Sequence, residues 1–196
     1  MSSSDSKKRP REEAIYYFDA RKALPRAVMQ RRPEAVRALL GKGHDANTRD
    51  KMTGNTVAHI AVVYRVPEIL QLLVEAGADV NARNNHGATP MMTPGLYDYK
   101  EKDNETKALL EILVAAGADA DIPNFYGSTP MSDSVVKQMP LTTELLIDAG
   151  GTVPPSLAAC AKTPRIRELV SAAIVWPTSL RCAWITACVK GGVLEN

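Results

Sequence analysis

The sequence predicts an all-α solenoid in which short helical units stack side by side. The first observation is a phrase, Gly-Xaa-Thr, that occurs at intervals of 33 and 40 residues, beginning at Gly54, Gly87 and Gly127. The second is a phrase, Gly-Xaa-Asp, that recurs at intervals of 34 and 40 residues, beginning at Gly43, Gly77 and Gly117. Two independent phrases with nearly the same period indicate a repeat protein, because a unit of this size buries its apolar face only against its neighbours.

The segments between these phrases favour helices. Residues 68–74 and 107–114 are apolar around most of a helix circumference, which is typical of a helix that lies between layers. Gly77 and Gly117 follow these segments, and glycine ends a helix without steric cost. Further helices are expected to begin where a capping hydroxyl precedes a proline, at Thr89-Pro90 and Thr129-Pro130.

The repeated phrase resembles the Thr-Pro-Leu-His-Xaa-Ala phrase of ankyrin repeats. It reads Thr-Val-Ala-His-Ile-Ala at residues 56–61 and Thr-Pro-Met at residues 89–91 and 129–131. Residues 77–81 are also similar to the phrase that closes an ankyrin unit. The resemblance implies an ankyrin-repeat solenoid of about four to five helix-turn-helix units, with hairpin fingers between them.

The resemblance also divides the chain. It is strong over residues 22–150 and weak over residues 151–174, and nothing matches residues 1–21 or 175–196. The first unit resembles an N-terminal cap with a basic outer face, and the last a shortened unit that has no finger and ends in a helix. The expected units span residues 22–50, 51–84, 85–124, 125–152 and 153–174.

The third unit contains seven additional residues between its two helices. Residues 96–105 are charged and polar, so we expect them to form a solvated loop. This loop is either a tolerated insertion, with Tyr97 packed against the stack, or a contact site. Pro94-Gly95 interrupts the first helix, and the third and fourth units lack the phrase's histidine, so both are expected to be less stable than the second. Local fraying is expected at residues 138–143, where β-branched residues open a helix.

Charge and cysteine content limit the classes of function. A net charge of +2 argues against nucleic-acid binding by the whole surface. The three cysteines lie in the last quarter of the chain and favour reduced thiols in the cytosol or nucleus, and no secretory pattern opens the chain. Residues 1–21 are expected to be a disordered basic tail. This tail is either simply solvated or carries a nuclear import signal at Lys7, Lys8, Arg9 and Arg11.

Residues 175–196 form an atypical apolar segment that contains both tryptophans. The segment lacks the polar outer face that an end cap needs. It either folds back over the last unit, presents a surface to a partner, or is an atypical tail. A membrane span over residues 170–189 is not expected, because Arg181 and Pro177 disfavour insertion.

The sequence contains no recognisable catalytic or metal-binding pattern. Nucleophile-elbow, phosphate-loop, zinc-helix and paired-cysteine motifs are absent. The histidines, His44, His59 and His86, lie in different units and do not converge on one metal. His59 is interpreted as structural, with the Thr56 hydroxyl as its partner. We therefore expect no enzymatic activity, no cofactor and no metal.

The resemblance implies a binding surface made by finger tips and first helices. Phe125 and Tyr126 are adjacent aromatic residues at one tip and are suited to anchor a partner. The alternative is that Phe125 packs on the neighbouring hairpin and only Tyr126 is exposed. Asn47 and Asn81 resemble ankyrin asparagines that a cellular oxygenase hydroxylates, or they hydrogen-bond to the hairpin backbone. The expected partner contacts are Met52, Asn55, Val63, Tyr64, Asn85, His86, Phe125, Tyr126 and Ser128.

The expected function is that of a non-catalytic adaptor that binds a partner protein in the cytoplasm, the nucleus or both. No specific nucleic acid is expected as a partner. The chain is expected to be monomeric unless residues 175–196 self-associate. The alternative is a membrane-associated adaptor held by that same segment. The identity of the partner is not predicted, because this fold displays a surface without determining what binds to it.

Overall fold

The computed structural model describes residues 23–92 and 103–175, and within them helical segments follow one another in pairs. The predicted tail 1–21 and residues 176–196 lie outside the described residues. In the third and fifth pairs the first member is a short 3-10 helix. The pairs are α1 (Ala23–Met29) with α2 (Pro33–Gly41), α3 (Val57–Val63) with α4 (Pro67–Glu75), η2 (Pro90–Met92) with α5 (Asp103–Ala115), α6 (Pro130–Val136) with α7 (Pro140–Asp148), and η4 (Pro155–Cys160) with α8 (Pro164–Val175).

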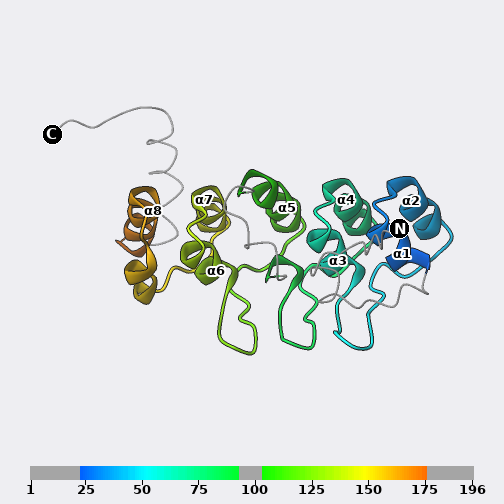
Figure 1. Ribbon diagram of the computed structural model, residues 1–196, viewed down its shortest axis with the longest axis horizontal. Coiled ribbons are helices and arrows are strands. Elements are labelled where there is room, and N and C mark those ends of the chain that lie inside the picture. Colours follow the sequence, from blue (N-terminus) through cyan, green and yellow to red (C-terminus); the bar gives the residue numbers. More distant parts are fainter. Residues whose placement is uncertain (1–22, 93–102, 176–196) are drawn as a thin grey trace, which may run out of the picture.

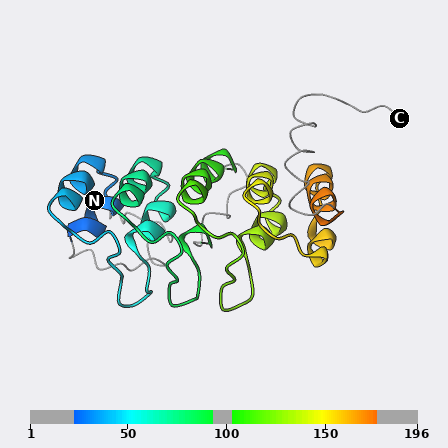
Figure 2. The same ribbon diagram turned by 180° about the vertical axis from the view of Figure 1, so that it is seen from behind.

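The pairs stack into a single row with two helical layers. Figure 1 shows α2, α4, α5 and α7 in one layer, with α1, α3 and α6 beneath them. Each second helix packs on the next second helix, from α2 through α4, α5 and α7 to α8. Three hairpin loops project from the opposite side of the first-helix layer, and the view from behind in Figure 2 shows them standing clear of the helices. The all-α solenoid predicted from the sequence is confirmed.

Glycines end the second helices, as the sequence predicts. Gly77 and Gly117 have φ angles of 80° and 84°, in the left-handed region. The N–H of the following residue then donates to the carbonyl five residues earlier, from Ala78 to Leu73 and from Ala118 to Leu113. These bonds satisfy carbonyls at the helix end that would otherwise have no partner.

The turn between the paired helices contains a residue with a positive φ angle, which was not predicted from the sequence. Arg31, Arg65 and Gln138 occupy equivalent turn positions, with φ angles of 52°, 51° and 59°. A residue with a Cβ atom pays about 1 kcal/mol to adopt this conformation. Two residues later a proline begins the second helix, where its missing N–H costs nothing.

A continuous apolar core runs through the row, from Leu24 in α1 to Ala173 in α8. In α4, Ile69, Leu70 and Leu73 are fully buried, whereas Glu68 is exposed to solvent. Burying each such side chain contributes about 1.5–3 kcal/mol to folding. Helix α4 therefore contacts both layers with one apolar face and keeps a polar face outside.

The insertion in the third unit differs from the prediction. Residues 96–105 were expected to form a loop, but α5 begins at Asp103 and is 13 residues long, whereas α4 and α7 each have nine residues. The expectation of a loop is therefore wrong for residues 103–105, and residues 96–102 lie outside the described residues. No proline occurs in residues 95–122, so none stops the helix from extending toward its start here.

The fifth pair has no finger, as expected, and is joined to the fourth by Gln138. Its side-chain amide donates to the carbonyls of Val135 (2.6 Å) and Cys160 (2.8 Å). Its oxygen accepts from the backbone N–H groups of Lys162 (3.0 Å) and Thr163 (2.8 Å). The buried Gln138 thus fixes the entry into α8.

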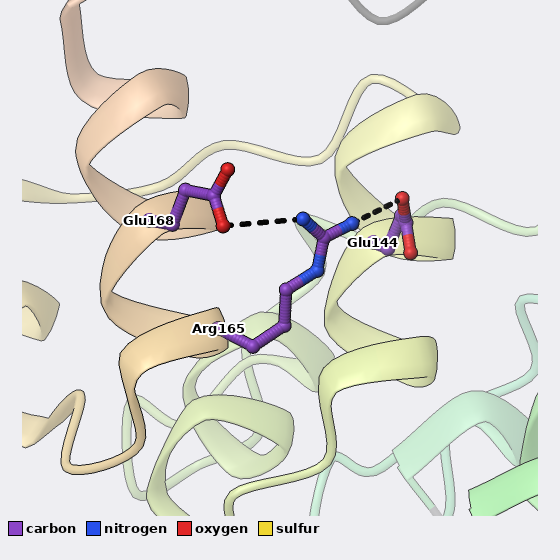
Figure 3. Close-up of polar contacts among 3 residues, drawn as sticks. All are labelled: Glu144, Arg165 and Glu168. Carbon is purple, nitrogen blue, oxygen red and sulfur yellow. Dashed lines mark hydrogen bonds and ion pairs between the residues drawn. The ribbon is translucent and has the colours of Figure 1, made fainter. Parts of the chain in front are cut away.

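An exposed ion-pair group also spans the joint between α7 and α8. Arg165 lies between Glu144 of α7, at 3.0 Å, and Glu168 of α8, at 3.2 Å (Figure 3). Exposed pairs of this kind contribute at most about 1 kcal/mol. The sequence reading anticipated neither Gln138 nor Arg165 as a link, and the fraying expected at residues 138–143 stays a prediction.

Candidate partner-binding surface

The three hairpin fingers, formed by residues 50–55, 84–88 and 124–128, are hydrogen-bonded to one another. The N–H of Asn85 in the second finger donates to the carbonyl of Thr53 in the first, at 2.9 Å. The N–H of Phe125 in the third finger donates in the same way to the carbonyl of His86 in the second, at 3.0 Å. The Asn85 side chain adds a bond to the Met52 carbonyl at 2.8 Å. These bonds fix the spacing of the finger tips before any partner arrives.

Two arginines each hydrogen-bond to their own finger and to the backbone of the following unit. Arg49 donates to the carbonyl of Gly54 in its own finger (3.2 Å) and to the carbonyl of Arg83 in the next unit (2.7 Å). Arg83 repeats the arrangement, donating to Gly87 (3.1 Å) and to Pro123 (2.8 Å). The sequence reading missed both, although an arginine five or four residues before the finger glycine was a visible signal.

At the base of the fingers, Asn47 and Asn81 join consecutive units. The Asn47 side chain donates to the Gly77 carbonyl (3.1 Å) and accepts from the Asp79 N–H (2.7 Å). Asn81 makes the same two bonds to Gly117 (3.1 Å) and Asp119 (2.8 Å). The structural role of both asparagines is confirmed, but their partners are backbone groups that follow the second helix of the next unit and not those of a hairpin. Their hydroxylation stays a hypothesis.

His59 is structural, as predicted, and also connects two units. Its Nδ1 atom lies 2.9 Å from the Thr56 hydroxyl and accepts from the Thr56 N–H at 3.1 Å. Because Nδ1 accepts from the backbone, Nε2 carries the proton and donates to the Ala88 carbonyl in the second finger, at 3.0 Å. Burial lowers the pKa of His59 to about 4, so its imidazole is neutral at pH 7.

The exposure of the predicted contact residues is uneven. Asn85 and His86 are exposed, whereas Val63, Tyr64 and Ser128 are half-buried. The expectation of an exposed contact is wrong at Asn55, which is buried because its amide oxygen accepts from the Asn84 side chain at 2.8 Å. The large hydrophobic side chains exposed at the tips are Met52 (73%), Phe125 (68%) and Tyr126 (78%).

Phe125 combines the two alternatives that the sequence left open. Its ring lies under the Arg83 guanidinium, 5.2 Å from the ring centroid, yet most of the side chain faces solvent. It also approaches Gly87 so closely that a Cβ atom there would lie 2.7 Å from the ring. Phe125 therefore leans on the second finger and is held in place while it remains accessible.

Other kinds of site have little support in the described residues. No group of three or more His, Cys, Asp or Glu side chains in residues 23–92 and 103–175 is arranged to hold a metal ion. No helix in those ranges is both long enough and apolar enough to cross a bilayer. The nuclear-import residues Lys7, Lys8, Arg9 and Arg11, and most of the segment 175–196, lie outside these ranges.

A comparison with family models places residues 24–102 in the ankyrin repeats, matched as three copies. No curated protein matches the chain. Ankyrin repeats generally serve as protein–protein interaction modules, and their domains are typically non-catalytic. The count of four to five repeats and the unit boundaries stay predictions. The three matched copies show that this chain contains ankyrin repeats over residues 24–102, and the stacked helix pairs continue through residues 103–175.

Proposed function

We propose that the chain is a non-catalytic adaptor that binds a partner protein across its row of fingers. The observation that carries this proposal is the location of its exposed apolar side chains. Among the described residues, the exposed large hydrophobic side chains are Met52, Phe125, Tyr126 and Val136. The first three lie at finger tips, and Val136 lies at the end of α6. Apolar groups gathered in this way contribute more to a contact with a partner than to the stability of the free chain.

The rigidity of the fingers supports the same proposal. The hydrogen bonds from Asn85 to Thr53 and from Phe125 to His86 hold the tips in register. A surface that is already ordered loses little conformational entropy on binding, so more of the contact energy appears as affinity. Interface residues of this aromatic type typically cost about 2 kcal/mol or more when they are truncated to alanine.

Capture from a cell extract with the full chain, followed by mass spectrometry and titration of the purified partner, tests the proposal. A Phe125→Ala/Tyr126→Ala variant is expected to weaken binding by about thirtyfold or more. The matched control is Gln71→Ala/Glu75→Ala, which removes an exposed hydrogen-bonded pair on α4, in the layer away from the fingers. Equal affinity of both variants for the captured partner would contradict binding by the fingers.

Two proposals concern residues outside the described ranges. Import into the nucleus through Lys7, Lys8, Arg9 and Arg11 is tested by changing the four residues to alanine and imaging the distribution of the protein. An unchanged distribution would rule out the signal.

Membrane attachment through residues 175–196 is the alternative function, and flotation of the full chain with vesicles, compared with a chain that ends at Ile174, tests it.

A further inference from the structure

The third finger lacks an arginine that the first two possess. Arg49 and Arg83 occupy equivalent positions before their fingers, and the corresponding residue before the third finger is Pro123. Arg49 and Arg83 each donate to the carbonyl of the glycine in their own finger, Gly54 or Gly87. No described residue donates to the equivalent carbonyl, that of Gly127.

The third finger is also the last in the row. The carbonyls of Thr53 and His86 accept an N–H from the following finger. The equivalent carbonyl is that of Tyr126, and no N–H in the described part of the chain reaches it because the fifth pair has no finger. Two neighbouring acceptors therefore remain open beside the exposed rings of Phe125 and Tyr126.

Charge follows the same pattern. The segment around the first finger, residues 43–57, balances two aspartates with Arg49 and Lys51, and the segment 77–91 balances Asp79 with Arg83. The segment 117–131 contains Asp119 and Asp121 and no lysine or arginine. The segment that carries the third finger is therefore the acidic end of the row, and its charge attracts a basic partner.

We propose that the third finger binds an extended segment of a partner protein that carries an arginine. This inference rests on the proposed binding function and deepens it by naming the partner's chemistry. The partner's guanidinium donates to the Gly127 carbonyl and lies against the exposed aromatic pair, as Arg83 does with Gly87 and Phe125. A backbone N–H of the same segment donates to the Tyr126 carbonyl and so continues the ladder of fingers.

Arginine suits this position better than lysine. The guanidinium is planar, so it stacks on an aromatic ring while its N–H groups donate outward in the guanidinium plane. A lysine supplies the charge without this geometry. The two internal examples, Arg49 and Arg83, both use the guanidinium to reach two carbonyls at once.

The test selects random linear peptides displayed on phage against the full chain. Peptides that lose binding to the Phe125→Ala/Tyr126→Ala variant are synthesised and titrated by fluorescence anisotropy. We expect these peptides to share an arginine, and its replacement by citrulline to weaken binding about tenfold or more. Citrulline keeps N–H donors but is neutral, so the charge-assisted hydrogen bond becomes a weaker neutral one and the cation–π contact is lost. Replacement by lysine is expected to weaken binding less than replacement by citrulline.

A matched pair of variants tests the vacant arginine position itself. Pro123→Arg supplies the third finger with its own arginine, and we expect it to weaken peptide binding about tenfold. Ala108→Arg adds the same charge at an exposed position in the first half of α5, nine residues before the segment 117–131, and is expected to leave Kd within about twofold. Circular dichroism melting checks that both variants fold, and the citrulline peptides need no variant at all.

The outcomes separate the two proposals. Finger-dependent peptides that tolerate citrulline would overturn the arginine inference and leave the proposed function standing. Failure to select any peptide that depends on Phe125 and Tyr126 would overturn the arginine inference, and the capture experiment with the same variant would still decide the proposed function. A large gain in peptide affinity when Lys7, Lys8, Arg9 and Arg11 are changed to alanine would identify the chain's own tail as the occupant instead of a partner. Affinity that falls with protein concentration would likewise identify a second copy.

Discussion

The second and third units begin with the same phrase and differ in how it is completed. In the second unit, His59 accepts from Thr56 at the start of α3 and donates to Ala88 in the next finger. In the third unit, Met92 occupies the histidine position, and the first helix is described as far as the 3-10 turn η2. Within the described residues, the Thr89 hydroxyl is the buried side-chain group that has no hydrogen-bond partner. His59 therefore completes the hydrogen bonding at the start of α3 and also bonds to the finger of the next unit. These two contacts are called the His59 clamp below.

The fourth unit is intermediate and clarifies the comparison. Ser132 occupies the histidine position there and completes a capping box with Thr129, with bonds of 3.0 Å and 3.3 Å. Its short side chain forms no bond to the following unit, because its hydroxyl donates to the Thr129 carbonyl. At this position His59 bonds both to the start of its helix and to the next unit, Ser132 bonds only to the start of its helix, and Met92 has no polar group for either contact. The two roles of the histidine can therefore be distinguished.

The largest expected effect is loss of the His59 clamp. His59→Ala leaves the buried Thr56 N–H without its partner and removes one of the two donors to the Ala88 carbonyl, which also accepts from the Asn84 N–H. It also empties a fully buried site, so we expect a loss of about 3 kcal/mol in the free energy of unfolding. Urea denaturation measures it. His86→Ala is the control, because His86 is exposed and its loss is expected to cost under about 0.5 kcal/mol. Similar losses in both variants would contradict the role of the clamp.

Acid should weaken the same clamp. The pKa of His59 is about 4 in the folded state and 6.5 without burial. Between these values the unfolded chain binds a proton that the folded chain does not, so stability rises with pH through this range. We expect the free energy of unfolding to be about 2.5 kcal/mol lower at pH 4.5 than at pH 7.5 as a result of this group.

A variant with no titratable group at this position isolates the contribution of His59. In His59→Gln, the difference between the two pH values should shrink by that amount when urea denaturation is repeated. Burial, followed by the nearby Glu144, raises the pKa of Asp148, and this acts in the opposite direction. Both proteins keep Asp148, so its effect cancels. An unchanged pH dependence in His59→Gln would show that His59 does not titrate as described.

The third unit should gain from the residue that it lacks. Met92→His places an imidazole where the Thr89 hydroxyl has no described partner, and we expect a gain of about 1 kcal/mol in the free energy of unfolding. Thermal and urea denaturation measure it. Met92→Leu keeps an apolar side chain of similar volume and is expected to change stability little. Destabilisation by histidine beyond that of leucine would indicate that the site cannot orient the imidazole.

The smallest effect concerns the turn positions with positive φ. Arg31→Gly relieves backbone strain, which is partly offset by the greater freedom of glycine in the unfolded chain, so we expect a gain of about 0.5 kcal/mol. Arg65→Gly relieves the same strain but loses the bond from Arg65 to the Thr106 hydroxyl (3.2 Å), which links the second unit to α5. The two variants should therefore differ in urea denaturation, with Arg31→Gly the more stable. The reverse order would contradict a stabilising link at Arg65.

Part of the candidate site was predictable from local patterns. Phe125 and Tyr126 lie beside a glycine that closes a tight turn, so their place at an exposed tip follows from the sequence. Asn55 lies beside a similar glycine and is buried, because Asn84 of the next finger bonds to it. The same turn chemistry thus gives opposite exposures, and only the neighbouring unit distinguishes them.

The sequence by itself determined the repeat period, the helix ends at Gly77 and Gly117, the helix start at Thr129-Pro130 and the partnership of His59 with Thr56. These features depend on residues within a few positions of each other, and backbone sterics or a local hydrogen bond decide them. Only the tertiary structure decided the hydrogen bonds between fingers, the bonds from Arg49 and Arg83 to the following unit, the burial of Asn55 and the anchoring of α8 by Gln138. Each of these joins residues 22 to 40 positions apart. Such contacts exist only after the units have stacked, because stacking brings into register backbone groups that no local propensity specifies.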